Sequence, residues 1–352
     1  MQWFNLHEEN ALVAQDTAIR CLRQRKIAPM PAGTFRMRPR LIESRQNPRV
    51  KELRAALARS GRTPSGLIAI EGEHLVTEAM RSHLRFASVF LREGYEPRGE
   101  FVELPQDAEH LLLPADLFAS AVSTEQPQGI AALVHPPAFS SATLFSGPAP
   151  LIPTLILVLA GLQDPGNVGT LMRSAEAFAA SSVLLLPGTA SPWNPKALRA
   201  SAGSAFRVPA INASEAEALE LLAQHKVPAI AAVAREGTPV GEAPLAGPCA
   251  LLIGSEGAGL SETLLTVAAH RITIPMPGNV ESLNAAIAGS LLLYETSRHR
   301  ALEAARQRQQ QPLSSPLERS SSTPSSRLER SGMEESAVLT SRTTNRQRPT
   351  SR

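Results

Sequence analysis

The chain has 352 residues, is 43% hydrophobic and carries a formal net charge of +3 at pH 7. This length and composition leave room for two packed domains and exclude a fibrous or wholly disordered chain. No apolar run approaches a membrane span, and residues 1–10 hold Glu8 and Glu9 and lack the apolar core of a secretory signal. The two cysteines, Cys21 and Cys249, support neither a disulfide framework nor a zinc site, so we expect a cytoplasmic protein without a metal.

Positive charge is concentrated at the two ends of the chain. Residues 1–54 hold 11 Lys/Arg against 5 Asp/Glu, and residues 301–352 hold 9 Arg against 5 Glu, so the stretch between them is acidic. Basic ends on an acidic body are typical of contact with a polyanion, although solvated, disordered ends would look the same. Four basic residues fall on one expected helix and are candidates for phosphate contacts: Arg45, Arg49, Lys51 and Arg54.

The first part of the chain divides into an arm, a small domain and a linker. Residues 1–40 lack periodicity and end in a mixture of Pro, Gly and Arg, which indicates an extended arm. Residues 41–137 indicate a small α/β domain, and residues 138–153 a Pro/Ser/Gly-rich linker. The expected helices of the domain are 45–59, 73–83 and 115–122, and its expected strands are 67–70, 87–91, 101–104 and 130–134.

Strands and helices alternate throughout residues 154–300, which predicts a parallel sheet covered on both faces. The expected strands are 155–160, 183–186, 229–233, 250–253 and 272–275, and the expected helices are 168–179, 195–201, 215–225, one after Ser261, and 282–299. Residues 301–352 have no aromatic residue and are rich in Ser, Arg and Gln. We therefore expect a disordered tail there.

Common nucleotide-binding and hydrolase motifs are missing from this second domain. The turn after its first strand, residues 161–166, reads GLQDPG and does not match the G-x-G-x-x-G of a dinucleotide-binding fold. No acidic residue follows the next strand to hold a ribose, and no phosphate-binding loop of the G-x-x-x-x-G-K-[ST] type occurs. Nor does a G-x-S-x-G elbow, a His pair or a carboxylate pair indicate a hydrolase.

Three short motifs each follow an expected strand and precede an expected helix. They are NVGTLMR at 167–173, GSEGAGLS at 254–261, and IPMPG at 274–278, which runs on to SLN at 282–284. Because the carboxyl ends of parallel strands meet at one edge of a sheet, we expect these motifs to form a single ligand-binding site.

Each polar residue in these motifs also has a simpler structural interpretation. Asn167 is a good helix N-cap, and Ser282 is a candidate N-cap of the last helix. Arg173 fits phosphate recognition, or it is an exposed helix residue paired with Glu176. Glu256 lies among glycines that permit close backbone approach to a ligand, yet it could be a surface carboxylate or a helix cap.

The order and spacing of the three motifs resemble those of the TrmH (SpoU) family of RNA 2′-O-ribose methyltransferases, in the SPOUT superfamily. The resemblance covers about residues 41–299 and implies an α/β fold with a trefoil-knotted, parallel-sheet catalytic domain. It implies that residues 41–137 form a small α/β substrate-binding domain similar to ribosomal RNA-binding proteins. It also implies a homodimer with the site near the subunit interface. Residues 1–38 and the tail after 303 have no counterpart in it.

The resemblance also implies a cofactor and roles for individual residues. S-adenosylmethionine would be held largely by backbone groups of the loops, at positions matching Gly254, Ile274, Met276 and Leu283. The positions linked to RNA binding and catalysis are matched by Arg173, Asn167, Glu256, Ser282 and Asn284. The implied substrate is RNA, with ribosomal RNA preferred and tRNA as the main alternative.

The implied reaction is an in-line displacement in which a ribose 2′-hydroxyl attacks the methyl carbon of a sulfonium. Because a hydroxyl is a weak nucleophile, the site must remove its proton or stabilise the charge that develops on oxygen. Arginine is hardly ever deprotonated, so we interpret Arg173 as an anchor for the neighbouring phosphate, which takes the proton, and as a stabiliser of the oxyanion. Asn167, Ser282 and Asn284 would orient the ribose and Arg173.

Two other classes of function stay open at this point. A catalytically silent RNA-binding or ribosome-assembly protein could use the same scaffold, although the intact Asn167, Arg173, Glu256 and Asn284 speak against it. A nucleotide-binding enzyme of different chemistry could use a similar sheet, although the missing phosphate loops disfavour it.

Overall fold

A computed structural model describes residues 39–58, 61–96, 104–145 and 152–310, which belong to one compact unit with two β-sheets. The predicted arm and most of the predicted tail lie outside the described residues, as do residues 101–103 of a predicted strand. Leu104, the last residue of that strand prediction, lies in a loop, and the strand of this region is β4 (Glu109–Leu113).

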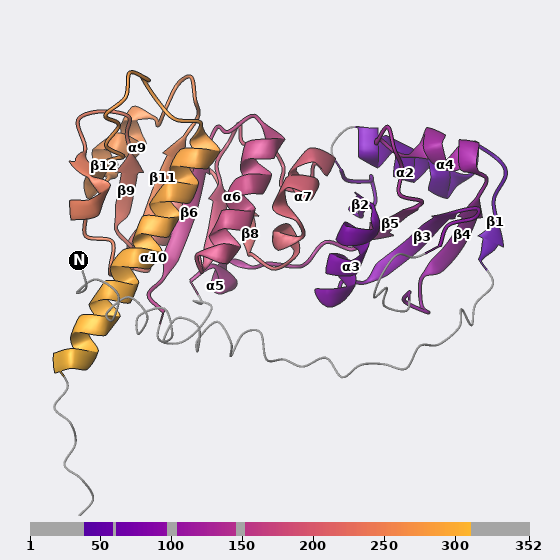
Figure 1. Ribbon diagram of the computed structural model, residues 1–352, viewed down its shortest axis with the longest axis horizontal. Helices are drawn as coiled ribbons and strands as arrows, with labels where there is room; N and C mark the ends of the chain where they lie inside the picture. Colours follow the sequence, from indigo (N-terminus) through magenta and orange to yellow (C-terminus); the bar gives the residue numbers. More distant parts are fainter. Residues whose placement is uncertain (1–38, 59–60, 97–103, 146–151, 311–352) are drawn as a thin grey trace, which may run out of the picture. The chain divides into compact units, whose positions relative to one another are not determined.

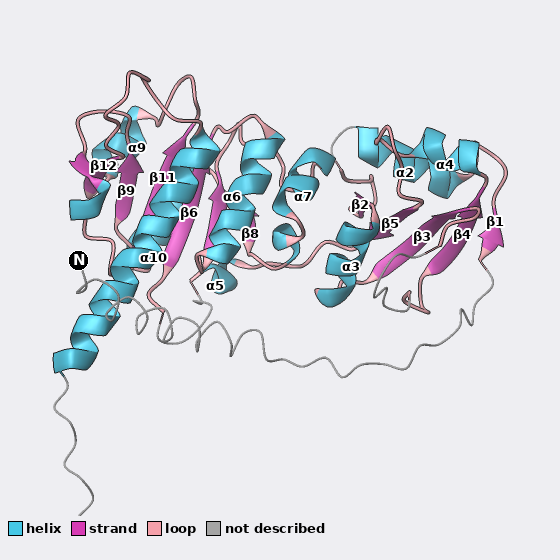
Figure 2. Cartoon of the chain, in the orientation of Figure 1, coloured by secondary structure: helices cyan, strands magenta, loops and turns pink. Residues whose placement is uncertain are grey.

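The first sheet confirms a small α/β domain in the N-terminal half of the chain. Its order is β1-β4-β3-β5-β2, with β1, β4 and β3 parallel and β5 antiparallel to its two neighbours. Helices α2 and α4 pack on one face and α3 on the other (Figure 2). The remaining elements are β1 (Arg40–Leu41), β2 (Ile68–Glu71), β3 (Phe86–Arg92), β5 (Ile130–Val134), α2 (Pro48–Ala58), α3 (Glu73–Arg81) and α4 (Ala115–Ala121).

The second sheet is parallel throughout, as predicted. Its order is β10-β12-β9-β11-β6-β7-β8, so β6 lies inside the sheet between β11 and β7 (Figure 1). The strands are β6 (Leu155–Ala160), β7 (Ser182–Leu185), β8 (Ala210–Asn212), β9 (Ala229–Ala232), β10 (Thr238–Pro239), β11 (Cys249–Gly254) and β12 (His270–Thr273). The trefoil knot implied by the family resemblance stays a prediction.

Helices cover both faces of this second sheet. Apolar side chains of α6, α7 and α10 pack on one face, and those of α5, α8 and α9 on the other. The helices are α5 (Ser141–Leu144), α6 (Pro165–Ala177), α7 (Pro195–Ser201), α8 (Glu215–Gln224), α9 (Glu262–Val267) and α10 (Ala285–Gln310), with short 3-10 turns η1 (Ser204–Phe206) and η2 (Val240–Glu242). No helix in these described ranges is long and apolar enough to cross a membrane.

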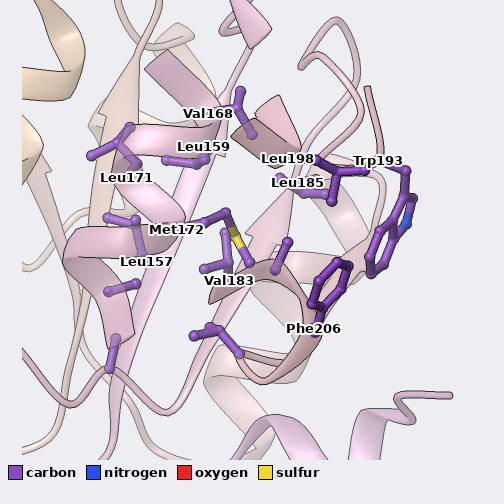
Figure 3. Packing of buried hydrophobic residues seen from close by; sticks show 14 of the residues in the cluster. Leu157, Leu159, Val168, Leu171, Met172, Val183, Leu185, Trp193, Leu198 and Phe206 are labelled. Atoms are coloured by element: carbon purple, nitrogen blue, oxygen red, sulfur yellow. The ribbon is translucent and has the colours of Figure 1, made fainter. Parts of the chain in front are cut away.

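The apolar spacing of α6 explains how this helix is held on the sheet. Val168, Leu171 and Met172 recur at helical spacing and are fully buried. They face Leu157 and Leu159, because alternate residues of β6 point to the same side of the sheet (Figure 3). The helix that carries the first motif is therefore fixed by the core, and its polar residues are left at the surface.

Helix α6 begins earlier than the cap prediction. Asp164, not Asn167, is the N-cap, and its side chain accepts a hydrogen bond from the backbone N–H of Gly166 at 2.8 Å. Pro165 occupies the first helical position, where its missing N–H costs nothing. Asn167 therefore lies inside the first turn, and its side chain is available for contacts across the sheet edge.

Helix α10 differs from its prediction at both ends. Asn284, not Ser282, is its N-cap, because the Asn284 Oδ1 accepts hydrogen bonds from Ala286 N at 2.9 Å and Ile287 N at 3.2 Å. Ser282 lies in the preceding loop. The helix continues to Gln310, so the predicted start of a disordered tail at residue 301 is too early. Residues 301–310 are Ala, Leu, Glu, Arg and Gln, all good helix formers, which allow the helix to extend.

Candidate active site

The loops after β6 and β7 meet at the carboxyl edge of the parallel sheet. Gly161 follows β6 with φ +71° and Gly188 follows β7 with φ +83°, a region that favours glycine. A Cβ added to Gly188 would lie 3.5 Å from the Cα of Gly161. The Gly161 N–H donates to Thr189 Oγ1 at 3.0 Å, and that hydroxyl donates to the carbonyl of Leu159 at 2.8 Å. These contacts fix two adjacent backbone loops beside the site.

The second motif forms a closed turn at the end of β11. The last residues of β11 and β6, Gly254 and Ala160, are partners in register, so the segments after them start side by side. The turn closes where the Gly259 N–H donates to the Ser255 carbonyl at 3.0 Å. A Cβ on Gly254 would lie 2.3 Å from the carbonyl carbon of Gly259, so this turn requires glycine. Glu256 lies at its exposed tip.

A chain of side-chain hydrogen bonds joins the three motifs. Asn284 Nδ2 donates to Asn167 Oδ1 at 3.2 Å, and Asn167 Nδ2 donates to Glu256 Oε1. Glu256 is thus neither an isolated surface carboxylate nor the cap of α9. Ser261 is that cap, since its Oγ accepts from Leu264 N at 3.2 Å. The structure therefore brings together three of the residues predicted for the site.

Arg173 lies on the same helix as Asn167 and is exposed, with no ion pair to any residue that the structure describes. The simpler interpretation, a pair with Glu176, is wrong. Glu176 instead accepts hydrogen bonds from Arg207, from Nε at 2.5 Å and from Nη2 at 3.0 Å. Arg173 is left as an available cation in the C-terminal half of α6.

Three of the four residues predicted to hold the cofactor lie on the segment between β12 and α10, and the fourth, Gly254, ends β11. Ile274 follows β12 and packs against the core, while Met276 and Leu283 are half-buried on the segment that leads to α10. Ser282 is exposed on the same segment. Turn glycines Gly257 and Gly278 face open space, because an added Cβ would meet no atom within 4 Å. Accessible backbone beside half-buried apolar side chains fits a cofactor held by peptide groups and apolar contacts.

A salt bridge between Lys196, in the first turn of α7, and Asp164, the N-cap of α6, was not predicted. Lys196 Nζ lies 2.7 Å from Asp164 Oδ1, beside the N-cap of α6. The hydrogen bond from Lys196 and that from the Gly166 backbone hold the pKa of Asp164 below its ordinary value. The Asp-Pro pair at 164–165 and the Asn-Pro pair at 194–195 are sequence signals of helix starts that could have revealed this contact.

Only part of the basic helix α2 is available for phosphate contacts. Arg49 bonds to Glu52 at 3.0 Å, and Arg54 donates to the Ser120 carbonyl at 2.9 Å. Lys51 on α2 and Arg45, which lies in the turn before α2 and not on the helix as predicted, are exposed and have no ion pair with the described residues. The predicted set of four candidates therefore reduces to these two.

Comparison with known proteins identifies the class of this sheet and site. Residues 154–294 match the SpoU rRNA Methylase family, and residues 47–132 match the MRM3-like substrate binding domain. The 23S rRNA (guanosine(2553)-2′-O)-methyltransferase RlmP of Bacillus subtilis is 34% identical over 257 residues, covering 72% of this chain and 97% of the relative. The chain belongs to the SpoU rRNA methylase family, which confirms the resemblance drawn from the three motifs.

Further relatives and solved structures agree with this assignment. An uncharacterised tRNA/rRNA methyltransferase of Synechocystis is 33% identical, covering 73% of this chain and 93% of the relative. A solved RNA 2′-O ribose methyltransferase is 31% identical with a TM-score of 0.60, covering 74% of this chain and 99% of that one. An AdoMet-bound rRNA methyltransferase from Sinorhizobium meliloti is 26% identical with a TM-score of 0.64, covering 74% of this chain and 98% of that one.

Proposed function

We propose that this chain transfers a methyl group from S-adenosylmethionine to a ribose 2′-hydroxyl of ribosomal RNA. As a member of the SpoU family it is an RNA 2′-O-ribose methyltransferase with S-adenosylmethionine as its cofactor. One observation carries the assignment of the site: the hydrogen-bonded chain from Asn284 through Asn167 to Glu256, with Arg173 on the same helix as Asn167 and without an ion pair to any described residue. This arrangement favours an enzyme over a catalytically silent scaffold, which would gain nothing from it.

Arg173 supplies the fixed positive charge of the proposed site. Its guanidinium stays protonated at neutral pH and, with no ion pair to a described residue, can bind the phosphate next to the target ribose. The same charge stabilises the oxyanion that develops as the 2′-hydroxyl loses its proton to that phosphate. S-adenosylmethionine, when bound, supplies the electrophilic methyl group.

Glu256 and the two asparagines orient the ribose in this proposal. The Glu256 carboxylate can only accept, so it fixes which end of the Asn167 amide faces it and turns Oδ1 toward Asn284. Each amide carries a second N–H that can bind a ribose oxygen. The exposed hydroxyl of Ser282 adds a further donor on the loop before α10. Alignment of the hydroxyl by such fixed groups lowers the entropic part of the barrier.

Two observations support ribosomal RNA over tRNA as the substrate. RlmP of Bacillus subtilis, by its name, modifies a guanosine of 23S rRNA, and it covers both domains of this chain. The substrate-binding domain at 47–132 suits a large, structured RNA. Because other relatives are named tRNA/rRNA methyltransferases, tRNA is the second candidate. We place the protein in the cytoplasm, where both RNAs are found. Cell fractionation tests this, and recovery of the protein outside the cytoplasmic fraction would contradict it.

The substrate is tested by incubating the protein with labelled S-adenosylmethionine and total RNA from a strain that lacks it. We expect label in ribosomal RNA, within an alkali-stable dinucleotide, because a 2′-O-methyl group blocks cleavage of the next phosphodiester. Label confined to tRNA would overturn the ribosomal assignment. Label on a base would overturn the ribose chemistry.

We further propose that the protein is a homodimer formed through α10. Three apolar residues one turn apart on this helix are exposed: Ile287 by 53%, Leu291 by 41% and Tyr294 by 50%. Phe178 at the end of α6 extends the patch and meets Tyr294 edge-on at 5.8 Å. An exposed apolar stripe on a helix that starts at the site suits a self-complementary interface. Light scattering should show a dimeric wild type and a monomeric Leu291→Asp variant. A monomeric wild type would contradict the dimer, and a variant with the unchanged mass of a dimer would contradict its formation through α10.

The trefoil knot is a third part of the proposal. Strand β12 lies two places from β11 in the sheet, whereas α10 packs against α6 and β11. Residues 274–284 must therefore cross back over the end of β9, and a threaded crossing would make the knot. Pulling the chain from residues 155 and 300 should give an extended length shorter than about 3.6 Å per residue. A full-length extension would exclude the knot.

A further inference from the structure

We propose that Arg207 is a positioning residue that keeps Arg173 available for RNA by holding the Glu176 carboxylate. The proposal rests on the role of Arg173 given above. It concerns a residue that lies outside the three motifs, directly after η1.

The spacing of α6 places a competitor beside Arg173. Glu176 follows Arg173 by three residues, so the two side chains are neighbours on the helix surface, and it is the only acidic residue of α6. Opposite charges at this spacing attract and form a pair when neither has a better partner. Glu176 would therefore form an ion pair with the Arg173 guanidinium and compete with RNA for it.

Arg207 prevents this pairing by filling both oxygens of the carboxylate. Its Nε and Nη2 bond to Glu176 Oε1 and Oε2 at 2.5 and 3.0 Å, which is the two-point geometry that an arginine fork provides. The remaining Nη1 bonds to Glu78 Oε2 at 2.8 Å and to Ser82 Oγ at 3.2 Å. Because every nitrogen of the guanidinium is bonded, Arg207 is held in place. Both Glu176 oxygens already accept from it, so the carboxylate gains little by turning toward Arg173.

The environment of Glu176 strengthens the need for a cation. Burial alone would raise the pKa of this carboxyl, but hydrogen bonds from Arg207 and Ser204 hold it below its ordinary value. The side chain is ionised and only 34% exposed. A half-buried carboxylate that loses its partner is costly, so without Arg207 it should take the nearest free cation, which lies one turn away.

The test compares Arg207→Ala with a double variant that also carries Glu176→Gln. We expect Arg207→Ala to lower kcat/KM for RNA about tenfold, or ~1.4 kcal/mol, without changing the Kd for S-adenosylmethionine. The double variant should recover to within about twofold of the wild type, since no carboxylate remains to trap Arg173. Glu176→Gln alone should be nearly fully active. Glu78→Gln is the matched control, because it removes a contact of Arg207 and leaves Glu176 held.

A merely structural bridge gives the opposite pattern. In that case the double variant stays as impaired as Arg207→Ala, or Glu176→Gln is equally impaired, and the proposal is overturned. Full activity of Arg207→Ala would also overturn it. Melting temperatures separate a loss of stability from a loss of activity. Arg207→Ala and the double variant both lose the bridge between Arg207 and Glu176, so they should melt alike, and only Arg207→Ala should lose activity. If Arg207→Ala does not fold, Arg207→Gln is compared with its own double variant. Failure of the proposed function is visible separately, as a wild type that methylates no RNA.

Discussion

The Asn284 side chain joins the start of α10 to the site: its Nδ2 donates to Asn167 Oδ1 at 3.2 Å while its Oδ1 caps the helix. Helix capping and site assembly are therefore linked through a single amide. A residue that keeps one function and loses the other can separate them.

Replacing Asn284 by Ser tests this linkage. Serine caps a helix about as well as asparagine, so the melting temperature should stay within about 1 °C of the wild type. The N–H donor to Asn167 is lost, and we expect kcat/KM for RNA methylation to fall roughly tenfold. Asn284→Ala, which loses the cap as well, should also melt earlier. An unimpaired Asn284→Ser would show that the contact with Asn167 plays no part in the reaction.

Gly254→Ala should abolish cofactor binding. The new Cβ would lie 2.3 Å from the Gly259 carbonyl carbon and would force the turn at the end of β11 to open. Gly257→Ala is the control within the same turn, because its Cβ would meet no atom within 4 Å. Calorimetry with S-adenosylmethionine should detect binding to the Gly257 variant only. Normal binding to both would mean that the turn does not shape the cofactor site.

Interior strands were predictable from sequence because they are continuous apolar runs. The residues of β6 and β11 that the sheet buries on both faces are Leu, Ile, Val, Ala and Cys, as parallel strands require. The strands β8 and β10 were missed because they are edge strands of three and two residues, too short to show a pattern. Strand β4 was missed because it begins with Glu109 and His110, polar residues that do not indicate a buried strand, although His110 is buried and its Nε2 lies 2.9 Å from the Pro105 carbonyl oxygen.

The meeting of the three motifs was predictable from sequence, and the contacts between their side chains were not. The positions of Asn167, Glu256 and Asn284 after three strands indicated one edge of the sheet, which the structure confirms. The partner of Glu176 was not predictable, because Arg207 lies 31 residues away and meets it only after α6 and η1 pack together. Local spacing favoured the Arg173 pair, and tertiary packing decided against it.

Arg45 and Lys51 should account for part of the RNA affinity. Each phosphate contact contributes about 0.7–0.9 to the dependence of binding on salt, so Arg45→Ser with Lys51→Ser should lower that slope by about 1.5. Arg49→Ser is the control from α2, since Arg49 is held by Glu52 and Glu109 at 3.0 and 3.3 Å. It should leave the slope unchanged. If the wild type, the double variant and Arg49→Ser all show the same dependence of RNA binding on salt, the RNA contacts lie elsewhere.

Arg300 should contribute to stability and not to catalysis. Its Nη2 donates to the carbonyls of Thr154 and Gly247 at 3.0 and 2.9 Å, which ties α10 to the starts of β6 and β11. Burial raises the pKa of the adjacent Cys249 thiol to about 11, so that neighbour is neutral and offers no counter-charge. We expect Arg300→Met to cost about 1–2 kcal/mol and about 4 °C in melting temperature. Arg298→Met, which loses only an exposed pair with Glu295, should cost less than about 0.5 kcal/mol. Equal melting temperatures would show that the Arg300 contacts add nothing.

The most direct measurement is methyl transfer to ribosomal RNA by Arg173→Ala, made alongside its affinity for S-adenosylmethionine. Because the proposed cofactor positions lie outside α6 and Arg173 pairs with no described residue, the substitution should leave the cofactor Kd and the melting temperature unchanged. Methyl incorporation should fall at least about a hundredfold, since the charge that stabilises the reacting oxygen is gone. Full turnover by Arg173→Ala, with cofactor binding intact, would contradict the account.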